Sequence, residues 1–174
     1  MNNFVFSERE DIILIDSVPE ARSLAISYIG ISHKSSGRVS DYLSRKDVSG
    51  EIAGYVVSAL IEDGYIDDMR IARSLIQSRR GRKAEGRRAL QQRMLQAGIS
   101  RETVDSAYEV MPEDSVSILE LFEERLMPDL RKQIDMPSFD AEKWMNKTFR
   151  FLLSRGYSTS LAMDTLRKRI RDVE

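Results

Sequence analysis

Apolar positions recur at helical spacing from Pro19 to the end of the chain, which predicts a succession of short helices. Three stretches repeat one plan: YLSRKDVSGEIAGYVVSAL, RMLQAGISRETVDSAYEVM and FLLSRGYSTSLAMDTLRKRI. In each, a helix ends in a short polar turn, and one apolar residue and one serine lead into the next helix. Gly98 and Gly156 suit the left-handed residue that closes a helix, and Asp47 takes that place in the first copy. The serine that follows suits an N-cap, so each stretch is predicted to be a corner between two helices.

The corners begin about fifty to sixty residues apart, which leaves room for three short helices in each copy. We therefore predict an all-α fold of three tandem three-helix repeats, over residues 19–64, 65–112 and 113–174. Short helices bury too little apolar surface to stand alone, so the repeats are expected to share faces in an elongated, curved array. In the N-terminal extension, residues 1–18, two β-prone runs favour a short β-hairpin at Phe4–Phe6 and Ile12–Ile15.

Composition narrows the class of protein. The chain has no cysteine, which excludes disulfides and thiolate zinc sites and agrees with a reducing cytoplasm. No apolar run approaches the roughly 18 residues that span a bilayer, and the N-terminus lacks the basic-then-apolar order of a signal peptide. We expect a soluble cytoplasmic protein that makes no membrane contact.

Charge alternates strongly along the chain, although the formal net charge is only −1. Residues 1–69 sum to −6 and residues 102–142 to −9, whereas residues 70–101 sum to +9 and residues 143–174 to +5. Asymmetry of this size indicates a surface that binds a polyanion. The alternative is that the blocks neutralise one another inside the fold, and the two interpretations can hold together.

The segment GYIDDMRIARSLIQSRRGRK, which begins at Gly64, joins a turn to the most basic part of the chain. We expect Tyr65 and Ile66 to be buried between the first and second repeats. Asp67 or Asp68 suits the N-terminus of the next helix. A metal site is less favoured there, because the chain has a single histidine and no other cluster of ligands at useful spacing.

Cations on the polar faces of the predicted helices are the candidate binding residues. Seven of them fall between residues 79 and 93, where only Glu85 offers a local partner. The candidates are Arg70, Arg73, Arg79, Arg80, Arg82, Lys83, Arg87, Arg88, Arg93, Lys143, Lys147, Arg150, Arg167, Lys168 and Arg171. Trp144 could stack on a nucleobase, but its place in an apolar helical stripe favours the core.

Motifs for catalysis are absent from the sequence. It has no glycine-rich phosphate loop, no G-x-S-x-G and no cysteine nucleophile, and its one histidine is His33. We expect no enzymatic activity, no cofactor and no metal.

The segment EDGYIDDMRIARSLIQSRRGRKAEGRRALQQRMLQAGIS resembles the central signature of the RecX family of bacterial RecA regulators. In that family a Gly-Tyr-(Ile/Leu)-Asp-Asp stretch precedes an arginine-bearing helix, a basic turn with glycine and a helix that ends in a Gly-Ile-type corner. Those features fall here on Gly64, Tyr65, Ile66, Asp67, Asp68, Ala72, Arg73, Arg79, Gly86, Leu90, Gly98 and Ile99. RFLLSRGYSTSLAMDTL resembles the last repeat of the family and SSGRVSDYLSRK its first, so the resemblance covers residues 20–172.

The resemblance implies a monomeric modulator that lies in the groove of the RecA–single-stranded DNA filament and usually inhibits the recombinase. Basic faces would meet the phosphate backbone of the DNA together with acidic patches of the protein. Two alternatives stay open: a helical regulator that binds duplex DNA without RecA, and an adaptor that binds only protein.

Overall fold

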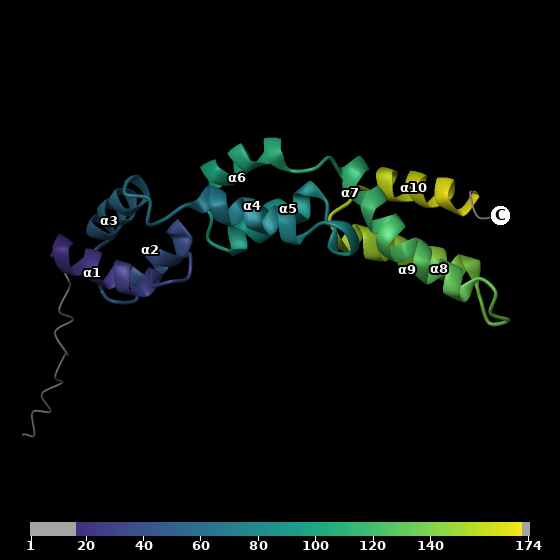
Figure 1. Ribbon diagram of the computed structural model, residues 1–174, viewed down its shortest axis with the longest axis horizontal. Helices are drawn as coiled ribbons and strands as arrows, with labels where there is room; N and C mark the ends of the chain where they lie inside the picture. Colours follow the sequence, from purple (N-terminus) through teal and green to yellow (C-terminus); the bar gives the residue numbers. More distant parts are fainter. Residues whose placement is uncertain (1–16, 172–174) are drawn as a thin grey trace, which may run out of the picture. The chain divides into compact units, whose positions relative to one another are not determined.

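The computed structural model describes residues 17–171, so the hairpin predicted at Phe4–Phe6 and Ile12–Ile15 lies outside the described part of the chain. Within it, helices follow one another and no strand forms, which confirms the predicted all-α fold (Figure 1). No helix of the described chain is long and apolar enough to cross a membrane. The chain divides into two compact units at Asp67 and Asp68.

The first unit contains the first triplet of helices: α1 (Val18–Ile29), α2 (Ser36–Ser44) and α3 (Gly50–Glu62). Each helix contacts the other two. Alanine at the crossing points lets the backbones approach closely, because Ala21, Ala25 and Ala53 are all buried in one apolar cluster with Leu43 and Leu60.

The second unit begins with the second triplet: α4 (Asp68–Ser78), α5 (Arg87–Gln96) and α6 (Arg101–Ala107). Two 3₁₀ turns flank these helices, η1 (Gly81–Lys83) after α4 and η2 (Tyr108–Val110) after α6. A separate apolar cluster lies among the three helices, with Ala72, Leu90, Met94 and Val104 at its centre.

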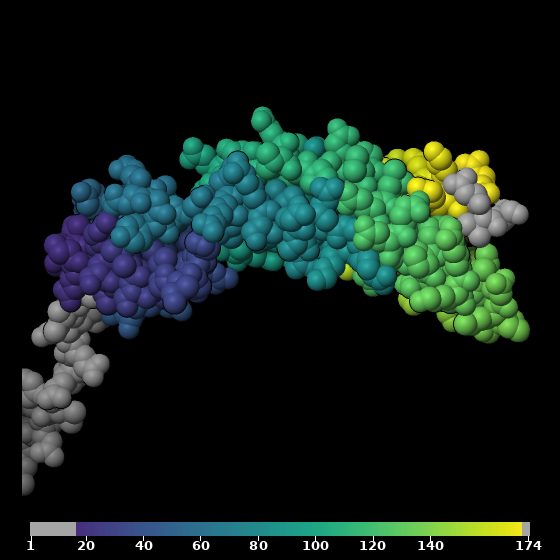
Figure 2. Space-filling model, in the orientation of Figure 1, coloured from purple at the N-terminus to yellow at the C-terminus, as the bar shows by residue number. Residues whose placement is uncertain are grey.

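The third triplet completes this unit. Its first rod is α7 (Asp114–Leu121), a π-helical turn η3 (Phe122–Leu126) and α8 (Met127–Gln133), which follow without a break. Then come α9 (Ala141–Ser154) and α10 (Thr159–Arg171). The apolar cluster of the third triplet contains Phe122, Leu152 and Leu166. It also contains Ala84, the residue that follows η1. The second and third triplets therefore share apolar contacts, and their surfaces meet without a gap in Figure 2.

The three predicted corners have one geometry. Asp47, Gly98 and Gly156 all have positive φ, at 58°, 78° and 87°. The next amide, that of Val48, Ile99 or Tyr157, donates to the carbonyl five residues earlier. This bond and the one from the preceding amide are those of a Schellman motif, which satisfies the last carbonyls of a helix.

A serine completes each corner as predicted. Ser49, Ser100 and Ser158 accept the backbone N–H three residues later, at 3.4, 3.2 and 3.3 Å. The apolar residue before each serine is buried, because the chain must turn inward to start a helix that packs on the previous one. The corner pattern is therefore confirmed in all three copies.

Successive residues after α3 have different surroundings. Ile66 is buried, as predicted, and it packs in the core of the first unit and not between two repeats. The predicted burial of Tyr65 is wrong, because this residue is 47% exposed. Only one of the two side chains faces this core. The aromatic one lies outside, where the Arg22 guanidinium lies 5.9 Å from the centre of the ring.

Glycines allow the second and third triplets to approach backbone to backbone. The Gly86 amide donates to the Arg155 carbonyl at 2.9 Å. A Cβ on Gly86 would lie 2.8 Å from the Gly156 carbonyl oxygen, and one on Gly156 would lie 2.7 Å from the Ala89 Cβ. The contact leaves no room for a side chain on either glycine.

Gly156→Ala should therefore lower the free energy of unfolding by about 2 kcal/mol or more, because the new methyl combines a positive φ with overlap against Ala89. Urea unfolding followed by far-ultraviolet circular dichroism, which reports on the helices of both units, measures the loss. Gly54→Ala is the control, since no atom lies within 4 Å of a Cβ built there and the residue is inside α3. That change should be neutral or stabilise by up to about 1 kcal/mol. Equal effects at the two positions would contradict the proposed close approach.

Candidate polyanion-binding surface

The basic turn η1 faces two carboxylates of the third triplet. The Gly81 amide donates to Glu120 at 3.2 Å, and the Arg82 amide donates to Glu124 at 3.2 Å. Glu120 and Glu124 lie four residues apart, on one side of the rod formed by α7 and η3. The Arg80 guanidinium adds a two-bond contact to Glu120, through Nε at 2.9 Å and through Nη2. This turn thus binds anions, and the anions it binds belong to the same chain.

A proline supplies a further acceptor for the turn. Pro128 has no N–H, so it cannot donate to the carbonyl of Glu124 as an α-helix would require. That carbonyl instead accepts from Arg82 Nη1 at 3.0 Å. The π-helical turn just before the proline loosens the helical bonding at the same place, and Met127 N–H donates to the Phe122 carbonyl. Arg82 therefore stabilises a helix that the sequence itself interrupts.

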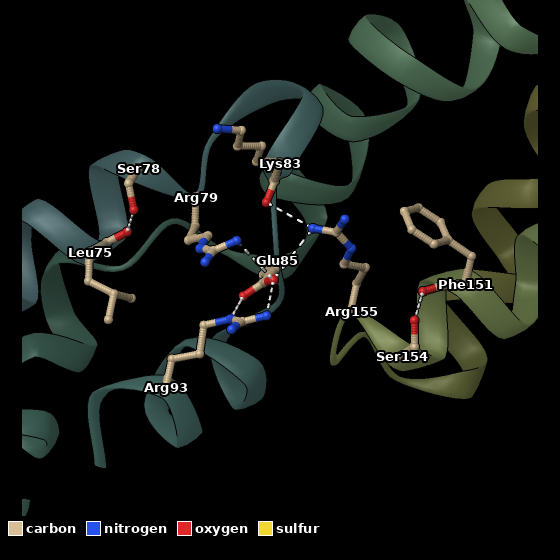
Figure 3. Close-up of polar contacts among 9 residues, drawn as sticks. All are labelled: Leu75, Ser78, Arg79, Lys83, Glu85, Arg93, Phe151, Ser154 and Arg155. Atoms are coloured by element: carbon tan, nitrogen blue, oxygen red, sulfur yellow. Dashed lines mark hydrogen bonds and ion pairs between the residues drawn. The ribbon is translucent and has the colours of Figure 1, made fainter. Parts of the chain in front are cut away.

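Glu85 is the most buried charged residue of the described chain, at 1% exposure. Arg93 donates to both of its oxygens, through Nε at 2.5 Å and Nη2 at 2.8 Å (Figure 3). Arg155 approaches at 3.4 Å and Arg79 at 3.8 Å. Arg155 also donates to the Lys83 carbonyl at 3.3 Å. Three guanidinium groups from three parts of the chain thus surround one carboxylate.

Within this cluster the pKa of one arginine is lowered and that of another is raised. Removal from water lowers the pKa of Arg155, and the neighbouring guanidinium groups lower it further, while Glu85 opposes both effects. The hydrogen bonds that Arg93 donates to Glu85 raise the pKa of Arg93. Glu85 is therefore needed to hold three like charges together.

Arg87 is also held within the chain. Its amide donates to Asp114 at 2.7 Å, and its side chain donates to the carbonyls of Pro112 and Met111, each at 3.1 Å. The guanidinium lies 4.5 Å from the centre of the Tyr108 ring. Arg87 thereby fixes the segment that connects α6 to α7.

The fifteen predicted cations separate into groups. Five contact a carboxylate or a backbone carbonyl outside their own helix: Arg79, Arg80, Arg82, Arg87 and Arg93. Eight side chains make no ion pair or hydrogen bond with another described residue: Arg73, Lys83, Arg88, Lys143, Lys147, Arg150, Arg167 and Lys168. Arg70 is exposed on α4, and Arg171 donates to the Arg167 carbonyl at 3.3 Å. Most cations of the basic run between residues 79 and 93 therefore already contact other residues of the same chain.

Sequence reasoning missed the partners of this run. Glu120, Glu124 and Arg155 lie about 40 to 70 residues from the groups that they contact, and no local pattern indicates which acids they are. Glu85 did carry a signal, because it is the single acid between residues 70 and 101.

The cations of α9 lie together on one side of the helix. Lys143, Lys147 and Arg150 are spaced four and three residues apart, so their side chains share a face. All three are exposed and line one shallow hollow with Asn146, Asp140 and Glu142. They form the best-defined set of unpaired cations on a single described helix.

Metal binding finds no support in the described residues, since no three potential ligands from His, Cys, Asp and Glu lie together in residues 17–171. Asp68 has another use. Its carboxylate is buried and accepts the Ser100 amide at 2.9 Å, where α6 begins.

Comparisons with known proteins point to one family. The family model described as RecX, second three-helix domain, matches residues 67–107. The regulatory protein RecX of Halalkalibacterium halodurans is 26% identical over 153 residues, which are 87% of this chain and 55% of the relative. RecX of Streptococcus pyogenes is 23% identical over 163 residues, or 90% of this chain and 58% of the relative. These similarities agree with the resemblance of the central segment to the RecX family.

Solved structures of the family have the same fold. The crystal structure of RecX from Lactobacillus salivarius covers 91% of this chain and 99% of its own, with a TM-score of 0.68 at 19% identity. A second crystal structure of regulatory protein RecX covers 83% of this chain and 68% of its own, with a TM-score of 0.63. The chain spans little more than half the length of the RecX relatives that it matches in sequence.

Replacing the buried acid should destabilise the second unit strongly. Glu85→Gln leaves three guanidinium groups without their carboxylate, and a broken buried ion pair costs about 3–5 kcal/mol. Urea unfolding followed by Trp144 fluorescence measures the change. A loss below about 1 kcal/mol, the range of exposed pairs, would show that solvent replaces the carboxylate.

Acid should release the contact between Arg80 and Glu120. The hydrogen bond from Arg80 lowers the pKa of Glu120 from its ordinary value of 4.5, and the Gly81 amide lowers it further. A lowered folded-state pKa gives stability that is present above the unfolded pKa and lost as pH falls through the folded one. Glu120→Gln should therefore cost about 1 kcal/mol at neutral pH, and the difference from the unmodified chain should vanish in acid.

The exposed Glu142, which no described residue pairs, provides the control for this measurement. Glu142→Gln should leave stability nearly unchanged at every pH. A Glu120 difference that persists below the ordinary range of glutamate would contradict the ion-pair explanation.

Proposed function

We propose that the chain is a non-enzymatic regulator of the RecA recombinase that binds the RecA–single-stranded DNA filament in its groove and inhibits it. Similarity to RecX proteins supports the choice of partner. The cytoplasm is the expected location because RecA filaments form there, and a monomer is the expected form. The observation that carries the proposal is the set of unpaired cations on α9, Lys143, Lys147 and Arg150.

The arrangement of charge favours backbone contact. Exposed lysines and arginines on one helical face can follow a line of phosphates, and such contacts are independent of sequence. Arg167 and Lys168 on α10 and Arg88 on α5 add further exposed cations in the same unit. The proposed interface therefore lies on the third triplet and the start of α5. The η1 turn instead connects the second triplet to the third through its contacts with Glu120 and Glu124.

Two other functions make different predictions. A RecA-independent regulator would bind duplex DNA with sequence preference, and a protein-only adaptor would bind no nucleic acid. Co-sedimentation with RecA filaments, naked single strands and duplex separates the three possibilities. Inhibition is measured as a fall in RecA strand exchange when the chain is added.

The triple variant Lys143→Gln, Lys147→Gln and Arg150→Gln tests the interface. Filament binding should weaken at least tenfold while the melting temperature stays nearly unchanged, as for most exposed changes. If all three cations contact phosphates of a single strand, the log–log slope of affinity against salt should fall by roughly 2, at about 0.7 for each contact.

The matched comparison is the variant with Arg79, Arg80, Arg82 and Lys83 replaced by glutamine. It should lose stability, because three of its four side chains have intramolecular partners. Unchanged filament binding by the α9 variant, with loss of binding by a folded η1 variant, would reverse the proposed assignment.

A further inference from the structure

Trp144 lies in a groove between α8 and α9. The groove has two connected parts, a hollow of about 220 Å³ lined with Met136, Ser138 and Phe139, and one of about 160 Å³ lined with Arg125 and Thr148. Gln133, Trp144 and Lys147 line both parts. We call this depression the Trp144 groove.

The indole has room on its surface for a partner. Trp144 is half-buried at the edge of the core of the third triplet, and no other ring or cation of the described residues stacks on it. Phe151, one helical turn beyond Thr148, differs in this respect. Guanidinium groups of Arg125 and Arg155 already lie over its ring, at 4.6 and 4.9 Å from the centre. Trp144 is thus available for stacking, whereas Phe151 is already covered.

The charged side chains that line the groove favour an anionic ligand. Lys143 and Lys147 line both the Trp144 groove and the shallow hollow that continues to Arg150. Carboxylates lie among these cations: Asp140 and Glu142, where α9 begins, line the same shallow hollow, and Asp129 on α8 lines the Trp144 groove. Asp140 is committed to the helix, since its Oδ1 accepts the Lys143 amide at 2.9 Å. Lys143, Lys147 and Arg150 thus share their hollow with one uncommitted carboxylate, Glu142, so a polyanionic backbone fits along the three cations.

We propose that the Trp144 groove binds single-stranded nucleic acid, with phosphates along Lys143, Lys147 and Arg150 and an unpaired base stacked on Trp144. A basic path beside an exposed aromatic ring is the common means of holding a single strand without sequence preference. A base in a duplex is already stacked on both faces, and its extrusion costs a few kcal/mol, so the groove selects single strands. This site rests on the proposed function and specifies which part of the filament the chain contacts.

The single tryptophan of the chain makes the site directly observable. The full chain is titrated at low salt with short oligothymidylate and with an abasic oligonucleotide of the same length and charge. Oligothymidylate should quench the Trp144 fluorescence and bind about 5- to 100-fold more tightly than the abasic strand. Equal affinity for the two strands, or binding of labelled oligothymidylate without a change in Trp144 fluorescence, would overturn the site.

Variants separate the base contact from the phosphate contact. Trp144→Leu should abolish the preference for oligothymidylate over the abasic strand, and Trp144→Phe should retain most of it. Lys147→Gln should weaken both strands equally, and Lys132→Gln on α8, outside the residues that line the groove, should change neither. If Trp144→Leu fails to fold, the quenching of the unmodified chain still decides the question.

Failure of this site is distinguishable from failure of the proposed function. Inhibition of RecA together with equal binding of the two strands would refute the base contact and leave the regulator intact. Quenching by oligothymidylate without any effect on RecA filaments would support the base contact and refute the regulator.

Discussion

The arrangement of the second and third triplets depends on one buried carboxylate. Glu85 is 1% exposed, and an ionised group that has lost its water is stable only if cations and hydrogen bonds replace that water. Arg93 supplies two of these bonds from α5, while Arg79 follows α4 and Arg155 follows α9. Because neither triplet contains all three cations, the charge of Glu85 is fully compensated only when the two triplets are in contact.

This requirement changes how the charged blocks are understood. The segment of +9 between residues 70 and 101 contacts acids of the following segment of −9, through Arg80 with Glu120 and through η1 with Glu124. The weaker basic segment from residue 143 onward pairs less, and its ion pairs are those of Arg155 with Glu85 and of Arg169 with Glu123 among the described residues. The most basic part of the sequence is therefore the less available one, and availability decides which cations can meet a polyanion.

Local features of the fold could be predicted from the sequence, whereas contacts between distant segments could not. The corners at Asp47, Gly98 and Gly156 depend on bonds that span five residues. A glycine or aspartate, an apolar residue and a serine in order are therefore sufficient to indicate them. Side-chain burial after Gly64 depends on the packing of the whole first unit, and there the prediction for Tyr65 was wrong. Apart from Glu85, the acids that pair with the predicted site residues are distant in the sequence. The sequence therefore identifies candidate cations, but it does not show which of them form ion pairs within the chain and which remain exposed and unpaired.

The match to the second three-helix domain of RecX illustrates why that separation needs the rest of the chain. Residues 67–107 contain the engaged arginines, but Asp114, Glu120, Glu124 and Arg155 all lie beyond that range. A glycine flanked by cations, with two successive amides pointing outward, is the arrangement that also holds phosphate. In the whole chain carboxylates already occupy it, so affinity for an anion measured on the second triplet alone would overstate what η1 contributes.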